Sequence, residues 1–160
     1  MIDALLELIE SRLVANVVAV RQETDDPLLA LELLLRRHVR LIRENAGIPR
    51  IVFSEEVYGA KSQRKYRVHD LLRRYLGRVA EFFRESQQAG TVRTDLSPDE
   101  LSVMFLGLVQ PAAILWHVSD GGFDVTRQAE KAWGVFSEAI KNGEDKGPEA
   151  GRASPATREN

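Results

Sequence analysis

Residues 101–118 read LSVMFLGLVQPAAILWHV, and this stretch of helical length contains no charged side chain. The four residues before it, SPDE, supply a helix cap at Ser97, a favourable first position at Pro98 and a capping-box carboxylate at Glu100. We therefore expect one helix over residues 97–119. A helix that is apolar on every side has to be buried on every side. Since a domain of this size usually buries one stripe of a helix, the spare face needs a partner, most simply a second copy of the chain.

Pro111 stands in the middle of this stretch. A proline inside a helix removes the hydrogen bond to the carbonyl four residues back, here that of Gly107, and its ring clashes with that turn. We therefore expect a kink at this point. The kink either improves packing or opens room for a ligand, and the sequence favours neither interpretation.

The composition is that of one globular domain. Hydrophobic residues make up 44% of the 160-residue chain and charged residues 29%, which suits a soluble fold with a real core. A net charge of −2 creates no field that draws the chain to nucleic acid, and the lack of cysteine excludes disulfides and thiolate metal sites. The N-terminus lacks the basic region of a signal peptide, and residues 101–118 lack a basic flank. We expect a cytoplasmic protein with no membrane span.

Apolar residues recur at helical spacing along the chain, and no strand pattern stands out. Residues 142–160 are rich in Gly, Pro, Ser and charge and have no large apolar side chain, so we expect a disordered tail. Residues 1–141 form the expected domain. Its six expected helices cover residues 2–22, 27–45, 48–58, 61–89, 97–119 and 125–141, with Gly47 ending the second and Gly90 the fourth.

No pattern of catalytic or metal-binding residues is present. His38, His69 and His117 fall on three different expected helices without a metal-type partner at short spacing. The chain also lacks a nucleophile elbow, a P-loop and a dinucleotide-binding glycine motif. We therefore expect neither an enzyme nor a bound cofactor or metal.

A basic cluster opens the fourth expected helix. It can be interpreted as a nucleic-acid patch or as a solvated helix face, and we favour the second because no recognition-helix layout accompanies it. Its members are Lys61, Arg64, Lys65, Arg67, Arg73, Arg74 and Arg78.

His38 follows the inward spacing of its helix, in line with Leu31, Leu35 and Ile42. One interpretation is a core histidine bonded to a backbone carbonyl. The other is a polar group that lines a cavity for a mostly apolar small molecule, between the second, third, fourth and fifth expected helices. The candidate ligand-binding residues are His38, Phe53, Leu72, Tyr75, Phe105, Gln110 and Trp116.

In this order and at this spacing, four stretches resemble the C-terminal regulatory domain of TetR-family transcription regulators. LLELIESRL at residues 5–13 resembles the helix that joins the DNA-binding and regulatory parts, and FSEEVY at residues 53–58 resembles a short helix and its exit. GTVRTDLSP at residues 90–98 resembles the loop before the next-to-last helix, and GGFD at residues 121–124 resembles the turn into the last. The resemblance implies a six-helix orthogonal bundle in which the first five helices surround a ligand pocket.

The same resemblance implies a homodimer in which the last two helices of each copy form a four-helix interface. Its candidate residues are Leu101, Met104, Leu108, Leu115, Ala129, Trp133, Phe136 and Ile140.

The family's helix-turn-helix domain is expected before Ile2, and these 160 residues do not contain it. We therefore expect a dimerising, small-molecule-sensing domain of a TetR-like regulator, a repressor by resemblance, that reaches DNA only through that missing domain. The alternative is a stand-alone helical module that pairs with a full-length regulator and does not bind DNA itself.

Overall fold

The protein is described from a computed structural model that covers residues 1–52, 54–59 and 62–143. Within these ranges the regular elements are helices, and one isolated antiparallel bridge joins Val92 to Lys141. The expected all-α fold is confirmed. The helices are α1 (Ile2–Glu23), α2 (Pro27–Glu44), α3 (Gly47–Val52), α4 (Glu55–Tyr58), α5 (Arg64–Gln88), α6 (Pro98–Gly107), α7 (Gln110–Val118) and α8 (Val125–Ala139).

The uncharged stretch forms two helices that meet at a break. At the break, the N–H groups of Leu108 and Val109 bond to carbonyls three residues back, not four. The cause lies one turn later, where Pro111 has no N–H for the carbonyl of Gly107. Pro111 instead occupies the first turn of α7, where a missing N–H leaves no bond unmade. The expectation of one kinked helix is therefore corrected to α6 and α7.

The segment expected over residues 48–58 is also divided, into α3 and α4. Gly47, which was expected to end the preceding helix, is the first residue of α3, and α2 already ends at Glu44. Phe53 stands between the two short helices and lies outside the described residues.

The cap expected at Ser97 is present in the structure. The Ser97 hydroxyl accepts from the backbone N–H of Glu100, and the Glu100 carboxylate accepts from the backbone N–H of Ser97, at 3.1 and 2.7 Å. Asp26 and Asp124 cap α2 and α8 with their side chains. The starts of α2, α6 and α8 therefore follow from local chemistry.

Gly90 ends α5 in the left-handed conformation, with φ at 77°. Its N–H donates to the carbonyl of Gln87, and the N–H of Thr91 donates to that of Ser86, both at 3.0 Å. These two bonds form the helix-ending motif that favours glycine at this position. Asn142, the first residue of the expected tail, donates its backbone N–H to the Thr91 carbonyl. Residues 144–160 lie outside the described ranges.

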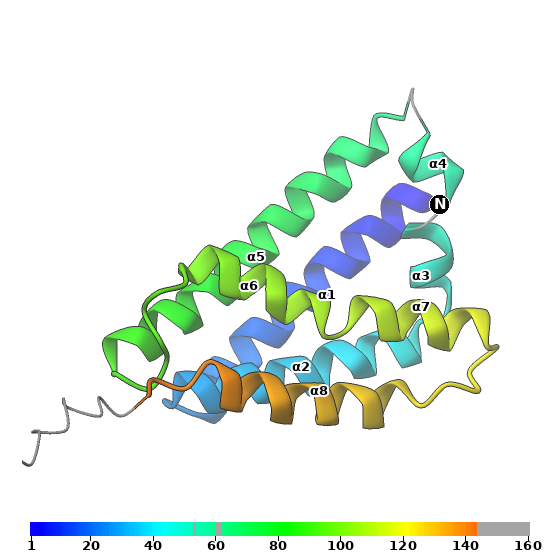
Figure 1. Cartoon of the computed structure of the whole chain (residues 1–160). Helices are drawn as coiled ribbons and strands as arrows, with labels where there is room; N and C mark the ends of the chain where they lie inside the picture. The colour runs from blue at the N-terminus through cyan, green and yellow to red at the C-terminus, as the bar shows by residue number, and fades with distance from the viewer. Residues whose placement is uncertain (53, 60–61, 144–160) are drawn as a thin grey trace, which may run out of the picture.

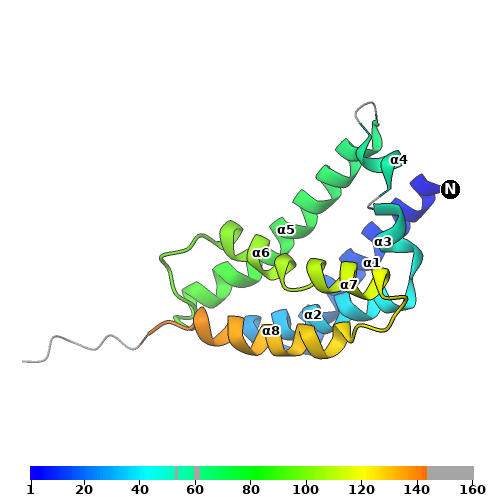
Figure 2. The same ribbon diagram turned by 45° about the vertical axis from the view of Figure 1, so that its right-hand side comes forward.

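Helix α2 lies at the centre of the bundle and contacts α1, α5 and α8. Helices α6 and α7 lie end to end, with α6 packed on α5 and α7 packed on α8 (Figure 1). From both viewing directions, the N-terminus, α3, α4 and the start of α5 gather at one end of the bundle (Figures 1 and 2). The start of α1 is therefore at the same end as the two short helices.

An aromatic cluster joins α5, α6 and α8. The Phe105 ring lies edge-on to the rings of Phe83 and Trp133, with centroids 6.3 and 6.2 Å apart. Phe136 completes the cluster at 6.2 Å from Phe83 and 6.0 Å from Trp133. Such edge-to-face pairs add to the stabilisation from apolar burial, so this cluster anchors α8 to the core.

Within the protomer, α6 and α7 are buried over only part of their surface, which leaves the spare face that was expected to need a partner. Pro98–Val118 is long and apolar enough to cross a membrane by composition, yet 33% of its most apolar window is buried in the bundle. The break at Leu108 and Val109 also interrupts its backbone hydrogen bonds. The exposed remainder leaves an apolar face on the surface of the protomer.

Candidate functional site

A cavity of about 70 Å³ lies between α1, α2, α3, α5 and α7. Most of its lining side chains are buried in the protomer, and ten of the thirteen are aliphatic. An apolar enclosure with a few converging polar groups is typical of a small-molecule site. The lining residues are Leu6, Ile9, Leu13, His38, Leu41, Ile42, Ile48, Val68, Leu71, Leu72, Tyr75, Gln110 and Ala113.

His38 of α2 and Tyr75 of α5 form a buried polar pair on the cavity wall. The Nδ1 atom of His38 lies 3.1 Å from the Tyr75 hydroxyl, and the two rings are tilted with centroids 5.6 Å apart. Burial lowers the pKa of His38 to about 4 and raises the pKa of Tyr75 above its ordinary value. Both groups are therefore neutral at pH 7. One interpretation of the sequence was a core histidine bonded to a backbone carbonyl. His38 is buried, but its partner is the Tyr75 hydroxyl.

The second ring nitrogen of His38, Nε2, belongs to a side chain that lines the cavity. In the described part of the chain, Nε2 forms no hydrogen bond, and no buried side-chain nitrogen or oxygen atom there lacks a partner. Nε2 must therefore reach accessible space, since it would otherwise be such an atom. The same holds for Gln110, whose half-buried side-chain amide lines the cavity and has no hydrogen bond within the described residues.

The break before Pro111 places Gln110 at the cavity. Because α7 restarts at Gln110, its first turn faces α3 and the cavity, and Ala113 follows one turn later on the same wall. The sequence left two interpretations of the kink at Pro111: it improves packing, or it opens room for a ligand. The break borders a cavity, as the second interpretation requires.

Four of the seven candidate ligand residues meet at this cavity, namely His38, Leu72, Tyr75 and Gln110. Phe105 does not, because its ring belongs to the aromatic cluster on the other side of α6.

The two remaining candidates also fall elsewhere. Trp116 lies near the end of α7 and lines a separate surface hollow with Phe123 and Arg43, so it does not contact the cavity. Phe53 is outside the described residues.

The sequence pattern predicted no part of the first helix at the cavity, whereas Leu6, Ile9 and Leu13 of α1 form one wall. Their spacing of three and four residues marked an inward stripe. That stripe could not show whether it faced solid core or a gap. Only the resemblance, which implied a pocket bounded by the first five helices, included this wall.

Exposed apolar side chains gather on α6, α7 and α8. These three helices carry six of the twelve exposed large hydrophobic side chains in the described residues. We call these six side chains together the apolar face. Its members are Val103, Met104, Ile114, Leu115, Val118 and Val135.

Only some of the eight candidate interface residues have side chains on the surface of the protomer. Met104 and Leu115 are exposed on the apolar face, and Leu108 and Phe136 are half-buried. The other four are between 0 and 7% exposed because they pack in the protomer core, which leaves them almost no surface for a partner. These four are Leu101, Ala129, Trp133 and Ile140.

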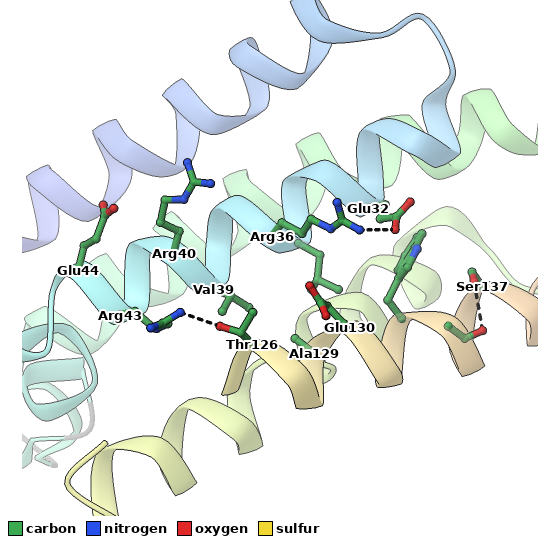
Figure 3. Close-up of a pocket in the computed structure, with 13 residues that line it drawn as sticks. Glu32, Arg36, Val39, Arg40, Arg43, Glu44, Thr126, Ala129, Glu130 and Ser137 are labelled. Carbon is green, nitrogen blue, oxygen red and sulfur yellow. Dashed lines mark hydrogen bonds and ion pairs between the residues drawn. The ribbon is translucent and has the colours of Figure 1, made fainter. Parts of the chain in front are cut away.

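A larger groove of about 870 Å³ runs between α2 and α8 (Figure 3). Charges of both signs line it, and several are engaged within the chain: Arg36 pairs with Glu32 at 3.1 Å, and Arg43 donates to Thr126 at 3.0 Å. Because its charged groups reach solvent and each other, the groove offers no enclosed recognition group. The smaller cavity around His38 is the better candidate site.

Three members of the basic cluster, Arg64, Arg67 and Arg74, pair with acidic side chains of α1, and Lys61 lies outside the described residues. Arg67 pairs with Asp3 and Glu7, at 2.9 and 3.3 Å, and Arg74 pairs with Glu10 at 2.7 Å. The pKa of Asp3 is lowered, chiefly by its hydrogen bond with Arg64. The interpretation as a solvated helix face is thus refined to a row of surface ion pairs between two helices.

Comparison with known proteins agrees with this architecture. Residues 9–139 match the family described as YsiA-like protein, C-terminal region, one of the TetR C-terminal families. The nucleoid occlusion factor SlmA of Vibrio vulnificus, strains YJ016 and CMCP6, is 23% identical over 141 residues, which cover 88% of this chain and 72% of SlmA. The match of most of the chain to the family is the stronger result, since SlmA alone is a distant relative.

Among solved structures, the fatty acid degradation regulator FadR from Bacillus halodurans has the same fold. It superposes with a TM-score of 0.71 at 18% identity, over 85% of this chain and 72% of that chain. The family match over residues 9–139 covers most of the chain and carries the assignment. This chain belongs to the YsiA-like family of TetR-type C-terminal regions.

Proposed function

We propose that this chain is the effector-sensing and dimerising domain of a TetR-like transcription regulator, a repressor that acts in the cytoplasm. The cavity around His38 carries the proposal. Its lining is mostly apolar and mostly buried, and two of its polar groups have no partner within the described residues. The effector is a small, mostly apolar molecule. The relatives found are named as a nucleoid occlusion factor and a fatty acid degradation regulator.

Helix α1 connects the cavity to the proposed response. Leu6, Ile9 and Leu13 line the cavity from α1, so a ligand that enlarges the cavity pushes on this helix. By family resemblance, α1 follows the helix-turn-helix domain, which is not among these residues. A dimer reads two half-sites about 34 Å apart, so a small tilt of α1 in each copy changes the fit to DNA.

The apolar face supports the dimer. Exposed apolar patches rimmed by polar residues are typical of protein interfaces. This patch lies on the helices that pair in the family's dimers. A two-fold interface uses the same patch on both copies, so one apolar face is sufficient to form it.

A cavity-filling variant tests the ligand site. Ala113 is 1% exposed on the cavity wall, and Ala113→Leu adds a side chain that fills much of the free volume. A small apolar binder such as benzene should raise the melting temperature of the wild type. Binding stabilises by about 2.7 kcal/mol at 100 times the dissociation constant. The variant should lose this response.

Ala139→Leu is the control, because residue 139 is exposed at the end of α8. It should respond to benzene like the wild type. A wild type that responds to no small apolar compound, or a response that survives Ala113→Leu, contradicts the proposal.

A further inference from the structure

We propose that the cavity selects uncharged ligands: molecules with a short apolar body and one group that both donates and accepts hydrogen bonds, such as a carboxamide or an alcohol. Carboxylates of the same size are excluded. This inference rests on the proposed function and adds the chemical class of the effector.

Charge is the first argument. None of the thirteen lining residues is Asp, Glu, Lys or Arg, and the two titratable groups, His38 and Tyr75, are both neutral at pH 7. A buried charge without a partner is strongly unfavourable. The start of α7 at Gln110 supplies only a partial positive charge, and Pro111 removes one of its free N–H groups.

Hydrogen bonding is the second argument. The Tyr75 hydroxyl is hydrogen-bonded to Nδ1 of His38, which leaves Nε2 for a ligand. If the hydroxyl donates to Nδ1, Nε2 carries the ring proton and is a donor. If Nδ1 carries the proton and donates to the hydroxyl, Nε2 is an acceptor. The Gln110 amide has both a donor and an acceptor. A ligand group that can donate and accept therefore forms hydrogen bonds with both His38 Nε2 and the Gln110 amide, whichever tautomer His38 adopts.

Size is the third argument. The volume of about 70 Å³ is several times the roughly 10–15 Å³ needed to hold one water molecule. It is well below the roughly 300–1,000 Å³ of sites for drug-sized ligands. The recognised part of the ligand is therefore a group of a few heavy atoms.

Butanamide and butanoate are a matched pair of probes, because they have nearly the same shape and differ in charge at pH 7.5. Titration of the full chain, labelled with ¹⁵N and followed by NMR, detects the weak binding expected of such small molecules. Butanamide should bind at least about 30-fold more tightly than butanoate, about 2 kcal/mol at 1.4 kcal/mol per tenfold. The Nε2 signal of His38 should shift more than the Nδ1 signal.

Variants at Gln110 test the polar contact. Gln110→Leu should weaken butanamide about tenfold and leave benzene binding unchanged, whereas Gln128→Leu, on the exposed surface of α8, should change neither. Gln110→Lys places a cation at the half-buried edge of the cavity, so it should reverse the preference toward butanoate.

The outcomes separate this inference from the proposed function. If benzene binds in the cavity but butanamide binds no better than butanoate, the site stands and the selection for uncharged ligands is overturned. Tight butanoate binding with a doubly protonated His38 ring also overturns it. If no probe perturbs the cavity signals in the wild type, the proposed function itself fails. Gln110 variants that leave the ratio of the two affinities unchanged overturn the role of Gln110.

Discussion

At the scale of single residues, the pair of His38 and Tyr75 dominates the site. The Nδ1 atom of His38 and the Tyr75 hydroxyl satisfy each other at 3.1 Å, in a wall that is aliphatic apart from these two residues and Gln110. The two residues are 7 and 3% exposed, so water does not readily replace this hydrogen bond. Removal of either group therefore leaves a buried polar atom unpaired.

Tyr75→Phe should destabilise the fold while leaving its shape intact. The variant leaves Nδ1 of His38 without its partner, and an unsatisfied buried polar group costs about 1–3 kcal/mol. Urea unfolding should show this loss. Tyr66→Phe is the matched control, because the Tyr66 side chain is 59% exposed, and its unfolding free energy should stay within about 0.5 kcal/mol of the wild type. Equal effects of the two variants would contradict the importance of the buried pair.

Stability should also depend on pH through His38. The folded-state pKa of about 4 lies below the ordinary value of 6.5, so between these pH values the unfolded chain binds a proton that the folded chain does not. The free energy of unfolding should therefore fall as the pH drops from 6.5 toward 4, by about 3 kcal/mol in total, and be independent of His38 above pH 6.5.

Urea unfolding of the wild type and of His38→Gln over this pH range measures that contribution, which the variant should lack. The exposed His69 serves as the control, and His69→Gln should keep the wild-type profile. Parallel profiles for the wild type and His38→Gln would show that His38 does not titrate in this way.

At the scale of elements, α1 is held in two different ways. Leu6, Ile9 and Leu13 pack on the cavity side, while Glu7 and Glu10 form ion pairs with arginines of α5. Surface ion pairs contribute little stability individually, typically less than about 1 kcal/mol. The ion pairs therefore adjust the position of α1 without locking it, which suits a helix expected to move.

Loss of these ion pairs should loosen the first half of α1 more than the whole fold. The variant Glu7→Gln with Glu10→Gln should speed hydrogen exchange of the amides in that half several-fold, because local opening then requires less free energy. High salt should have the same effect on the wild type, since it screens exposed pairs.

The control removes the same two charges from α8, as Glu130→Gln with Glu138→Gln, both at exposed positions. It should leave exchange in α1 unchanged. Equal exchange rates of α1 in both double variants would argue against the ion pairs as its restraint.

At the scale of the whole molecule, the distribution of apolar surface decides assembly. The core takes Leu101, Phe105 and Trp133 from α6 and α8, whereas Met104 and Leu115 remain 45 and 47% exposed. Phe136 contacts Phe83 and Trp133, so a charge at Phe136 would disrupt the core of the protomer as well as any dimer. A clean test of the dimer therefore needs an exposed position.

Leu115→Glu should split the dimer and leave the protomer folded. A carboxylate buried without a partner in an interface costs about 3–5 kcal/mol, which corresponds to a dissociation constant at least about 100-fold higher. Sedimentation equilibrium measures the change, and circular dichroism checks the fold. Leu29→Glu, at a 42% exposed position on α2, should leave the dimer intact. A wild type that is monomeric at micromolar concentration would contradict the proposal.

The sequence by itself determined the helical fold class and most helix boundaries. Ser97, Asp26 and Asp124 act through hydrogen bonds to residues two or three positions away, and Gly90 through its own backbone conformation. Such local interactions do not depend on the rest of the fold. The inward direction of His38 was also readable, because helical spacing alone decides which side chains share a face.

Only the tertiary structure decided what each inward face meets. Phe105 and Tyr75 both occupy inward positions, yet Phe105 packs on Phe83 and Trp133, whereas Tyr75 borders a cavity with His38. For the same reason, Trp133 and Ile140 were expected at a dimer interface, whereas both lie in the core of the protomer. Periodicity gives the direction of a side chain relative to its own helix axis. The neighbour in that direction is set by crossing angles, and the break before Pro111 shows how one missing N–H changes them.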